Sequence, residues 1–85
     1  NSGIHNRAFY NVMQSKDGGG SFLFTPTEAA VLYYVTLTRL APSSTFSDCR
    51  RTLLNVTTQR YQGQPTVQQD KLNAIKAAYT AVGIL

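Results

Sequence analysis

The stretch TPTEAAVLYYVTLTRLAPSSTFSDCR, residues 25–50, opens with a strong helix-start signature. Thr25 precedes Pro26, and Glu28 stands three places after Thr25. A threonine before a helix and an acid three places later each accept a hydrogen bond from the other's otherwise unpaired backbone N–H. Proline fits the first helical position because its ring already holds a helical φ. We therefore expect a helix from Pro26 to about Leu40.

The same signature recurs twenty residues later, at Thr45 and Asp48. Helical spacing of three and four then continues through the segment, at Phe46, Cys49, Leu53, Val56 and Arg60. Gly63 is a natural stop, and Pro65 confirms the break. The signature and the spacing predict a second helix in this region.

Two more helices are expected at the ends of the chain. Ser2 can cap a helix that runs to about Gln14, with Ile4, Ala8 and Val12 on one face. The last helix is expected to start at Thr66, with Gln69 completing its cap, and to end at Gly83. Its apolar stripe is the most regular in the chain and consists of Leu72, Ile75, Tyr79 and Val82.

These segments predict an all-α fold, a four-to-five-helix orthogonal bundle that forms a single helical domain over residues 1–85. "SFLF" at 21–24 is either a short extended piece or a buried loop. In the helix from Pro26, one broad apolar face is expected, consisting of Ala30, Tyr33, Tyr34, Leu37 and Leu40, with Val31 and Val35 beside it. So many apolar positions suggest contacts on more than one side of this helix.

Charge and hydropathy argue against two function classes. The net charge is +4, but most of the cations are scattered singly, whereas binding along a phosphate backbone needs a stripe of them. Only Arg50 and Arg51 are adjacent, and neighbouring side chains on a helix point in different directions. No apolar run reaches the length of a membrane span. We expect neither nucleic acid nor membrane as a partner.

Catalytic equipment is scarce in the sequence. His5 is the only histidine, and four dispersed acids with one histidine cannot supply the ligand cluster of a zinc site. The serines lack a base and a group to orient it, and GGG at 18–20 lacks the Lys-Ser/Thr of a phosphate-binding loop. No catalytic, cofactor-binding or metal-binding residue is therefore predicted within this chain.

Two residues are open to more than one interpretation. Cys49 is interpreted as a small buried residue, with a reactive thiol or a bridge to another segment as the alternatives. Asn55 opens an N-V-T triplet that matches the N-glycosylation acceptor pattern, although it lies inside an expected helix.

Three stretches, in order, resemble one known family. NSGIHNRAFY (1–10) resembles the N/S-S-G-[IV]-x-N-[KR]-A-[FA]-Y segment of the thermolysin-like zinc metalloendopeptidases, which opens their helical C-terminal domain. LAPSSTFSDCR (40–50) is similar to a link between two helices of that domain, and IKAAYTAVGI (75–84) is similar to its closing helix. The matches span the chain almost end to end. Cys49 departs from the pattern, because an apolar residue is usual there.

The resemblance implies a division of labour with polypeptide that precedes this segment. In the family, the catalytic histidine lies two places before the residue equivalent to Asn1, and the zinc ligands lie further upstream. It implies zinc and calcium in the intact enzyme, with none bound by this chain. Asn1, Ser2 and Gly3 are then the residues nearest the missing histidine.

The resemblance also implies partners and a location. The partners are the N-terminal zinc-binding catalytic domain and peptide or protein substrates, and the localisation is extracellular. The chain would form one wall of the substrate cleft and be inactive alone, as the C-terminal part of a larger protein. The first helix would face the lost domain and show an apolar patch, exposed or covered by self-association, that includes some of Ile4, Phe9, Val12 and Met13.

Two other functions remain open from the residues alone. A stand-alone helical protein-interaction module without enzymatic activity would have the same helices and the same lack of catalytic groups. A small basic nucleic-acid binder would instead need a basic stripe on its folded surface.

Overall fold

The computed structural model describes residues 2–85, and within that range four α-helices account for the regular structure. They are α1 (Ser2–Gln14), α2 (Pro26–Thr38), α3 (Phe46–Arg60) and α4 (Pro65–Thr80). Extended pairing in the described part is limited to one isolated antiparallel bridge between Lys16 and Phe22, in the α1–α2 loop. The predicted all-α class is confirmed.

Both capping signatures form as predicted. The Glu28 backbone N–H donates to Thr25 Oγ1 at 3.0 Å, and the Thr25 N–H donates to Glu28 Oε1, also at 3.0 Å. At α3, Asp48 N–H donates to Thr45 Oγ1 at 3.1 Å, and Thr45 N–H donates to Asp48 Oδ2 at 2.8 Å. Each pair satisfies two backbone donors that the first helical turn leaves open. These local interactions fix where α2 and α3 begin.

Of the other two helices, α1 spans Ser2–Gln14 as predicted, whereas the start of α4 differs from the prediction. Ser2 is the first helical residue of α1, so it does not precede the helix as a cap. In α4, Pro65 is the first helical residue and Gln64 precedes it without a side-chain cap, so the predicted start at Thr66 is wrong by one residue. Gln69 does not complete a capping box; its Nε2 donates to Asn73 Oδ1 instead. The ring of Pro65 already holds a helical φ, and this favours a helix start at Pro65 over the predicted cap at Thr66 and Gln69.

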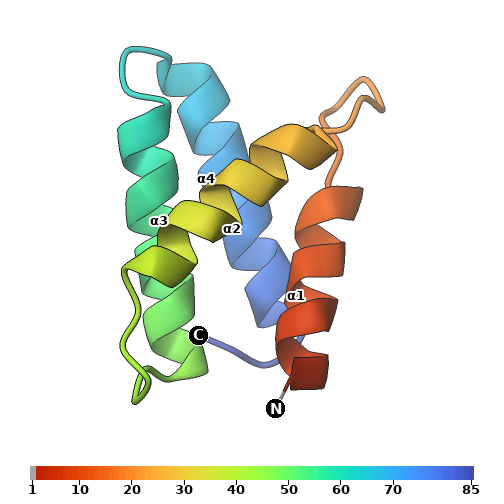
Figure 1. Ribbon diagram of the computed structural model, residues 1–85. Coiled ribbons are helices and arrows are strands. Elements are labelled where there is room, and N and C mark those ends of the chain that lie inside the picture. The colour runs from red at the N-terminus through yellow and green to blue at the C-terminus, as the bar shows by residue number, and fades with distance from the viewer. Residues whose placement is uncertain (1) are drawn as a thin grey trace.

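α3 and α4 form a helical hairpin, and α1 and α2 pack against it (Figure 1). α3 and α4 run antiparallel, joined by a short turn in which Gly63 has a φ of 83°. α1 lies along the C-terminal part of α4, and α2 crosses diagonally, packing mainly against α3. The chain after α4 turns at Gly83, whose φ is 81°, as predicted.

The shared core contains residues from every helix and from the loop before α2. Phe24 in that loop is 1% exposed, which shows that the end of SFLF is a buried loop. The predicted faces of α3 and α4 are confirmed at their centres. The largest fully buried side chains are Tyr79, Phe24, Leu32, Leu53, Ile75, Val12, Thr36, Thr57 and Cys49.

The broad apolar face predicted on α2 is only partly correct, because Tyr33 and Val35 pack against the core but Ala30 is exposed. Ala29, Leu32 and Thr36 are the buried residues of this helix, whereas Tyr34 and Leu37 are 70% and 61% exposed. Aromatic and aliphatic hydropathy favoured the Tyr34–Leu37 side, but the fully buried positions of α2 are Ala29, Leu32 and Thr36, on another side of the helix. α2 therefore keeps an apolar outer face.

The exposed apolar patch that was predicted on α1 is largely absent. Val12 is 1% exposed, and Ile4, Phe9 and Met13 are half-buried against the common core. The Phe9 ring packs edge-on against Tyr33 of α2, with ring centroids 4.7 Å apart. The apolar side of α1 is thus largely used within this chain.

Candidate functional site

The N-terminal end of α1 carries the three residues expected nearest to an upstream catalytic group. Asn1 lies outside the described residues. Ser2 begins α1, and Gly3 is solvent-exposed at the end of the molecule where the helix starts (Figure 1). A chain segment that precedes Ser2 would therefore approach the domain at this end.

His5 lies one turn into α1 and has a packing role. Its ring stands edge-on against Phe46, the first residue of α3, with ring centroids 4.4 Å apart. Partial burial lowers the pKa of His5 below its ordinary value. The imidazole is therefore neutral near pH 7 and joins the starts of α1 and α3.

The acidic side chains do not assemble into a metal site with His5 or Cys49. Within residues 2–85, no three His, Cys, Asp or Glu side chains come close enough to share a metal ion. Glu28 forms an ion pair with Lys71, and Asp48 forms one with Arg51. A zinc site needs three or four such ligands around one point, so the described residues do not fit zinc.

Cys49 is buried beside two tyrosines. Its Sγ lies 3.9 Å from the Tyr79 hydroxyl, which in turn lies 2.9 Å from the Tyr33 hydroxyl. Burial raises the pKa of the Cys49 thiol and of both phenols. A protonated and enclosed thiol is neither a nucleophile nor a ligand. The interpretation of Cys49 as a small buried residue is confirmed.

The glycine segment forms a turn closed by Asp17. Its Oδ1 accepts from the backbone N–H groups of Gly19 and Ser21 at 2.8 and 3.0 Å. Gly20 has a φ of 85°, which only glycine adopts without strain. These hydrogen bonds form a turn within the loop, and they do not indicate a phosphate-binding site.

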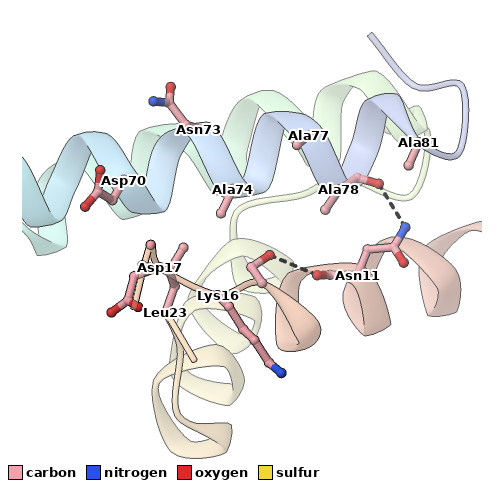
Figure 2. A pocket seen from close by; sticks show the side chains of 12 residues that line it. Asn11, Lys16, Asp17, Leu23, Asp70, Asn73, Ala74, Ala77, Ala78 and Ala81 are labelled. Carbon is pink, nitrogen blue, oxygen red and sulfur yellow. Dashed lines mark hydrogen bonds between the residues drawn. The ribbon is translucent and has the colours of Figure 1, made fainter. Parts of the chain in front are cut away.

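A hollow of about 590 Å³ lies where this loop and the end of α1 face α4 (Figure 2). Asn11 spans it, because its Nδ2 donates to the carbonyl oxygen of Ala78 at 3.3 Å. The Lys16 side chain points away from α4 in Figure 2. The α4 side of the hollow consists of Asp70, Asn73, Ala74, Ala77, Ala78 and Ala81.

Small side chains dominate the α4 side of this hollow, which includes Ala74, Ala77, Ala78 and Ala81. Small side chains let another polypeptide backbone come close to a helix. The groups around the hollow include carboxylates and amides, but no base paired with a nucleophile. The arrangement can hold a segment of polypeptide, and it offers no chemistry of its own.

Lys71 is a structurally central residue that the sequence does not reveal. It is 6% exposed, lies 3.1 Å from Glu28 Oε2 and also donates to the carbonyl oxygen of Leu23. Its ammonium sits over the rings of Phe24 and Tyr61, 4.6 and 4.9 Å from their centroids. A lysine on a helix is normally solvent-exposed, and Phe24 and Tyr61 surround Lys71 in space but are not its neighbours in the sequence.

Asn55 is exposed on α3, while Thr57 of the same triplet is fully buried. Glycosylation at Asn55 stays a prediction. None of the helices within residues 2–85 has both the length and the apolar character needed to cross a bilayer.

Comparison with known sequences identifies one family over nearly the whole chain. The family described as thermolysin metallopeptidase, alpha-helical domain, matches residues 1–84. Neither the curated proteins nor the solved structures gave a significant match.

Proposed function

Because this chain belongs to the thermolysin metallopeptidase family, as its α-helical domain, we propose that it forms one wall of the substrate cleft in a secreted zinc endopeptidase. The observation that carries this proposal is the family match over residues 1–84. A domain of this family that has no reactive group of its own would contribute to activity by positioning the substrate or the catalytic domain. The all-α fold and the scattered acids are consistent with that role.

In this proposal, zinc and the groups that act on substrate belong to the N-terminal catalytic domain, the partner that the family implies. The described residues of this chain do not fit a zinc site. We therefore propose that they contribute shape, and we expect the chain alone to be inactive. Calcium, which the same family suggests, would also be held outside this chain. Peptides and proteins are the proposed substrates of the complete enzyme.

The N-terminal end of α1 is the proposed point of closest approach to the reacting centre. Ser2 and Gly3 anchor the helix start, and the contact of His5 with Phe46 holds that start against α3. The alanine-lined hollow between α1 and α4 is the proposed seat for a helix of the catalytic domain, since small side chains permit close packing.

The proposal is tested by titrating the purified chain with zinc, followed by a peptidase assay on an internally quenched peptide. We expect no stoichiometric zinc uptake by calorimetry and no hydrolysis above a zinc-only blank. Hydrolysis that depends on zinc and co-purifies with the chain would overturn the proposal. A stand-alone interaction module is the second candidate, favoured by the apolar outer face of α2.

A further inference from the structure

A second, smaller hollow of about 300 Å³ lies between the end of α1 and the start of α2. It is lined by Met13, Gln14, Phe22, Phe24, Thr25 and Pro26. Phe22 is 58% exposed, so the hollow is open to solvent on that side, whereas Phe24 belongs to the shared core. The hollow therefore connects solvent with the junction between the two helices.

The chain contains two sulfur-bearing side chains, Met13 and Cys49, and the fold gives them opposite surroundings. Cys49 is 1% exposed, and burial raises the pKa of its thiol, so it stays protonated and unreactive. Met13 is only half-buried and borders the open hollow. A thioether reacts without losing a proton, and a peroxide is little larger than a water molecule. An oxidant from solvent therefore meets the Met13 sulfur first.

We propose that peroxides oxidise Met13 selectively to methionine sulfoxide, and that this modification loosens the junction between α1 and α2. In the reaction, a lone pair on Met13 Sδ attacks one peroxide oxygen, so an S–O bond forms while the O–O bond breaks. The hydrogen on the transferred oxygen passes to the departing oxygen, which leaves as water. The sulfur loses two electrons, and the peroxide gains them.

The sulfoxide changes the packing because its oxygen is polar where the thioether was apolar. Met13 packs against the shared core as a hydrophobic side chain. Burying the new oxygen without a hydrogen-bond donor is unfavourable. Hydration of that oxygen requires either water between Met13 and the rings that line the hollow, or withdrawal of the side chain from the core. Both outcomes lose apolar contacts at the junction.

The loop between the two helices is anchored immediately after Met13. The Leu23 N–H donates to the Ser15 carbonyl oxygen at 2.9 Å, and Lys16 pairs with Phe22 in the isolated bridge. Because Phe22 also lines the hollow, a displaced Met13 side chain disturbs the loop through a shared wall. This inference does not rest on the peptidase assignment, since it concerns only the surroundings of the two sulfurs.

The chemistry is tested by treating the 85-residue chain with hydrogen peroxide at neutral pH and mapping the product with trypsin. Tryptic peptide 8–16 contains Met13, and tryptic peptide 40–50 contains Cys49. We expect the first to gain the mass of one oxygen atom, at a rate within about tenfold of that in concentrated urea, and the second to stay unmodified. A Met13 that reacts only in urea, or a Cys49 that reacts as fast as Met13, would overturn the inference.

The effect of the sulfoxide on stability is measured by urea unfolding. Oxidation should raise the unfolding equilibrium constant by about fivefold or more. Treatment with the two methionine sulfoxide reductases, one for each epimer, should restore the native midpoint. Met13→Leu is the matched control, because leucine has a similar volume and no sulfur; its midpoint should not respond to peroxide. An unchanged midpoint in the oxidised native chain, or an equal loss in Met13→Leu, would contradict the proposal.

Brief trypsin cleavage of the folded chain shows where the loosening occurs. Lys16 lies in the α1–α2 loop and Arg60 ends α3, and both are exposed. Oxidation should accelerate cleavage after Lys16 by about fivefold or more relative to cleavage after Arg60. Equal acceleration at the two sites would mean that the whole fold opens, and it would overturn the proposed effect on the junction.

Discussion

The buried ammonium of Lys71 lies 3.1 Å from the Glu28 carboxylate and joins four parts of the fold. Glu28 also caps α2 through Thr25 and accepts a hydrogen bond from the Tyr61 hydroxyl at 2.7 Å. Lys71 reaches the loop carbonyl of Leu23 from α4. One carboxylate thus couples the start of α2 to the end of α3 and to α4. We call Glu28, Tyr61 and Lys71 the polar cluster.

Replacing Lys71 by methionine should destabilise the chain. Methionine keeps the apolar stem but loses the ammonium that donates to the Leu23 carbonyl and pairs with Glu28. Loss of a buried charge-assisted hydrogen bond costs about 1.5–3 kcal/mol. Lys76→Met on the exposed side of α4 is the control, with a change within about 0.5 kcal/mol. Urea unfolding measures both, and equal midpoints for the two variants would contradict a structural role for Lys71.

Acid should weaken the fold through Glu28. Partial burial opposes its ionisation, but the hydrogen bonds from Tyr61, the Thr25 N–H and Lys71 outweigh burial and lower its pKa to about 2. The unfolded chain, with an ordinary pKa of 4.5, binds the proton first. The stabilisation from Glu28 is therefore complete above pH 4.5 and lost as the pH falls toward 2.

This pH effect is checked by thermal unfolding between pH 6 and pH 2. Glu28→Gln should unfold at a lower temperature at pH 6 and show a flatter decline below pH 4.5. An unchanged slope in that variant would show that other groups dominate the acid response.

Alkali should weaken the fold through the tyrosines. Burial raises the pKa of Tyr33 and Tyr79, and it raises that of Tyr61 to about 12. The unfolded chain ionises its tyrosines near pH 10, so stability is full below that pH and falls as the pH rises above it. Ultraviolet absorbance of phenolate, followed with circular dichroism, should show these ionisations only together with loss of helix.

Tyr79→Phe tests the contact with Tyr33 and Cys49. The variant leaves the half-buried Tyr33 hydroxyl without its 2.9 Å partner and should lose about 1–2 kcal/mol. Tyr34→Phe on the exposed side of α2 is the matched control and should be nearly neutral. A Tyr79→Phe chain as stable as the native one in urea would contradict this account of the pair.

Thr57→Val should stabilise the chain. Thr57 is fully buried on α3, and its hydroxyl lacks a hydrogen-bond partner within residues 2–85. An unpaired buried hydroxyl costs about 1–3 kcal/mol, and valine has nearly the same shape. Thr58→Val is the control, because the Thr58 hydroxyl donates to the Leu54 carbonyl at 2.8 Å; it should bring no gain. A lower urea midpoint for Thr57→Val would contradict the prediction.

The sequence predicted the local features better than the packing. Thr25 and Thr45 start their helices through contacts within four residues, so their pattern is visible in one dimension. The buried side of α2 depends on which helices pack against it, and it consists of Ala29, Leu32 and Thr36. Composition favoured the opposite side of α2 because exposed tyrosine and leucine resemble core residues.

The polar cluster also could not be predicted from the sequence. Glu28 was predicted as a cap, but its contact with Lys71 joins residues 43 positions apart. Such a pair appears only when α2 and α4 are placed in space. By contrast, His5 lies in the helix predicted over Ser2–Gln14, but its contact with Phe46 of α3 could not be predicted from the sequence.

The central claim is that this helical chain completes a peptidase whose zinc lies in another domain. The most direct measurement adds the 85-residue chain to a zinc-binding catalytic domain of the thermolysin family, produced without its helical part. Hydrolysis of an internally quenched peptide should rise with added chain and saturate, with no activity from either part alone. Hydrolysis that stays flat at every concentration of the chain, with no binding between the two parts, would contradict the account.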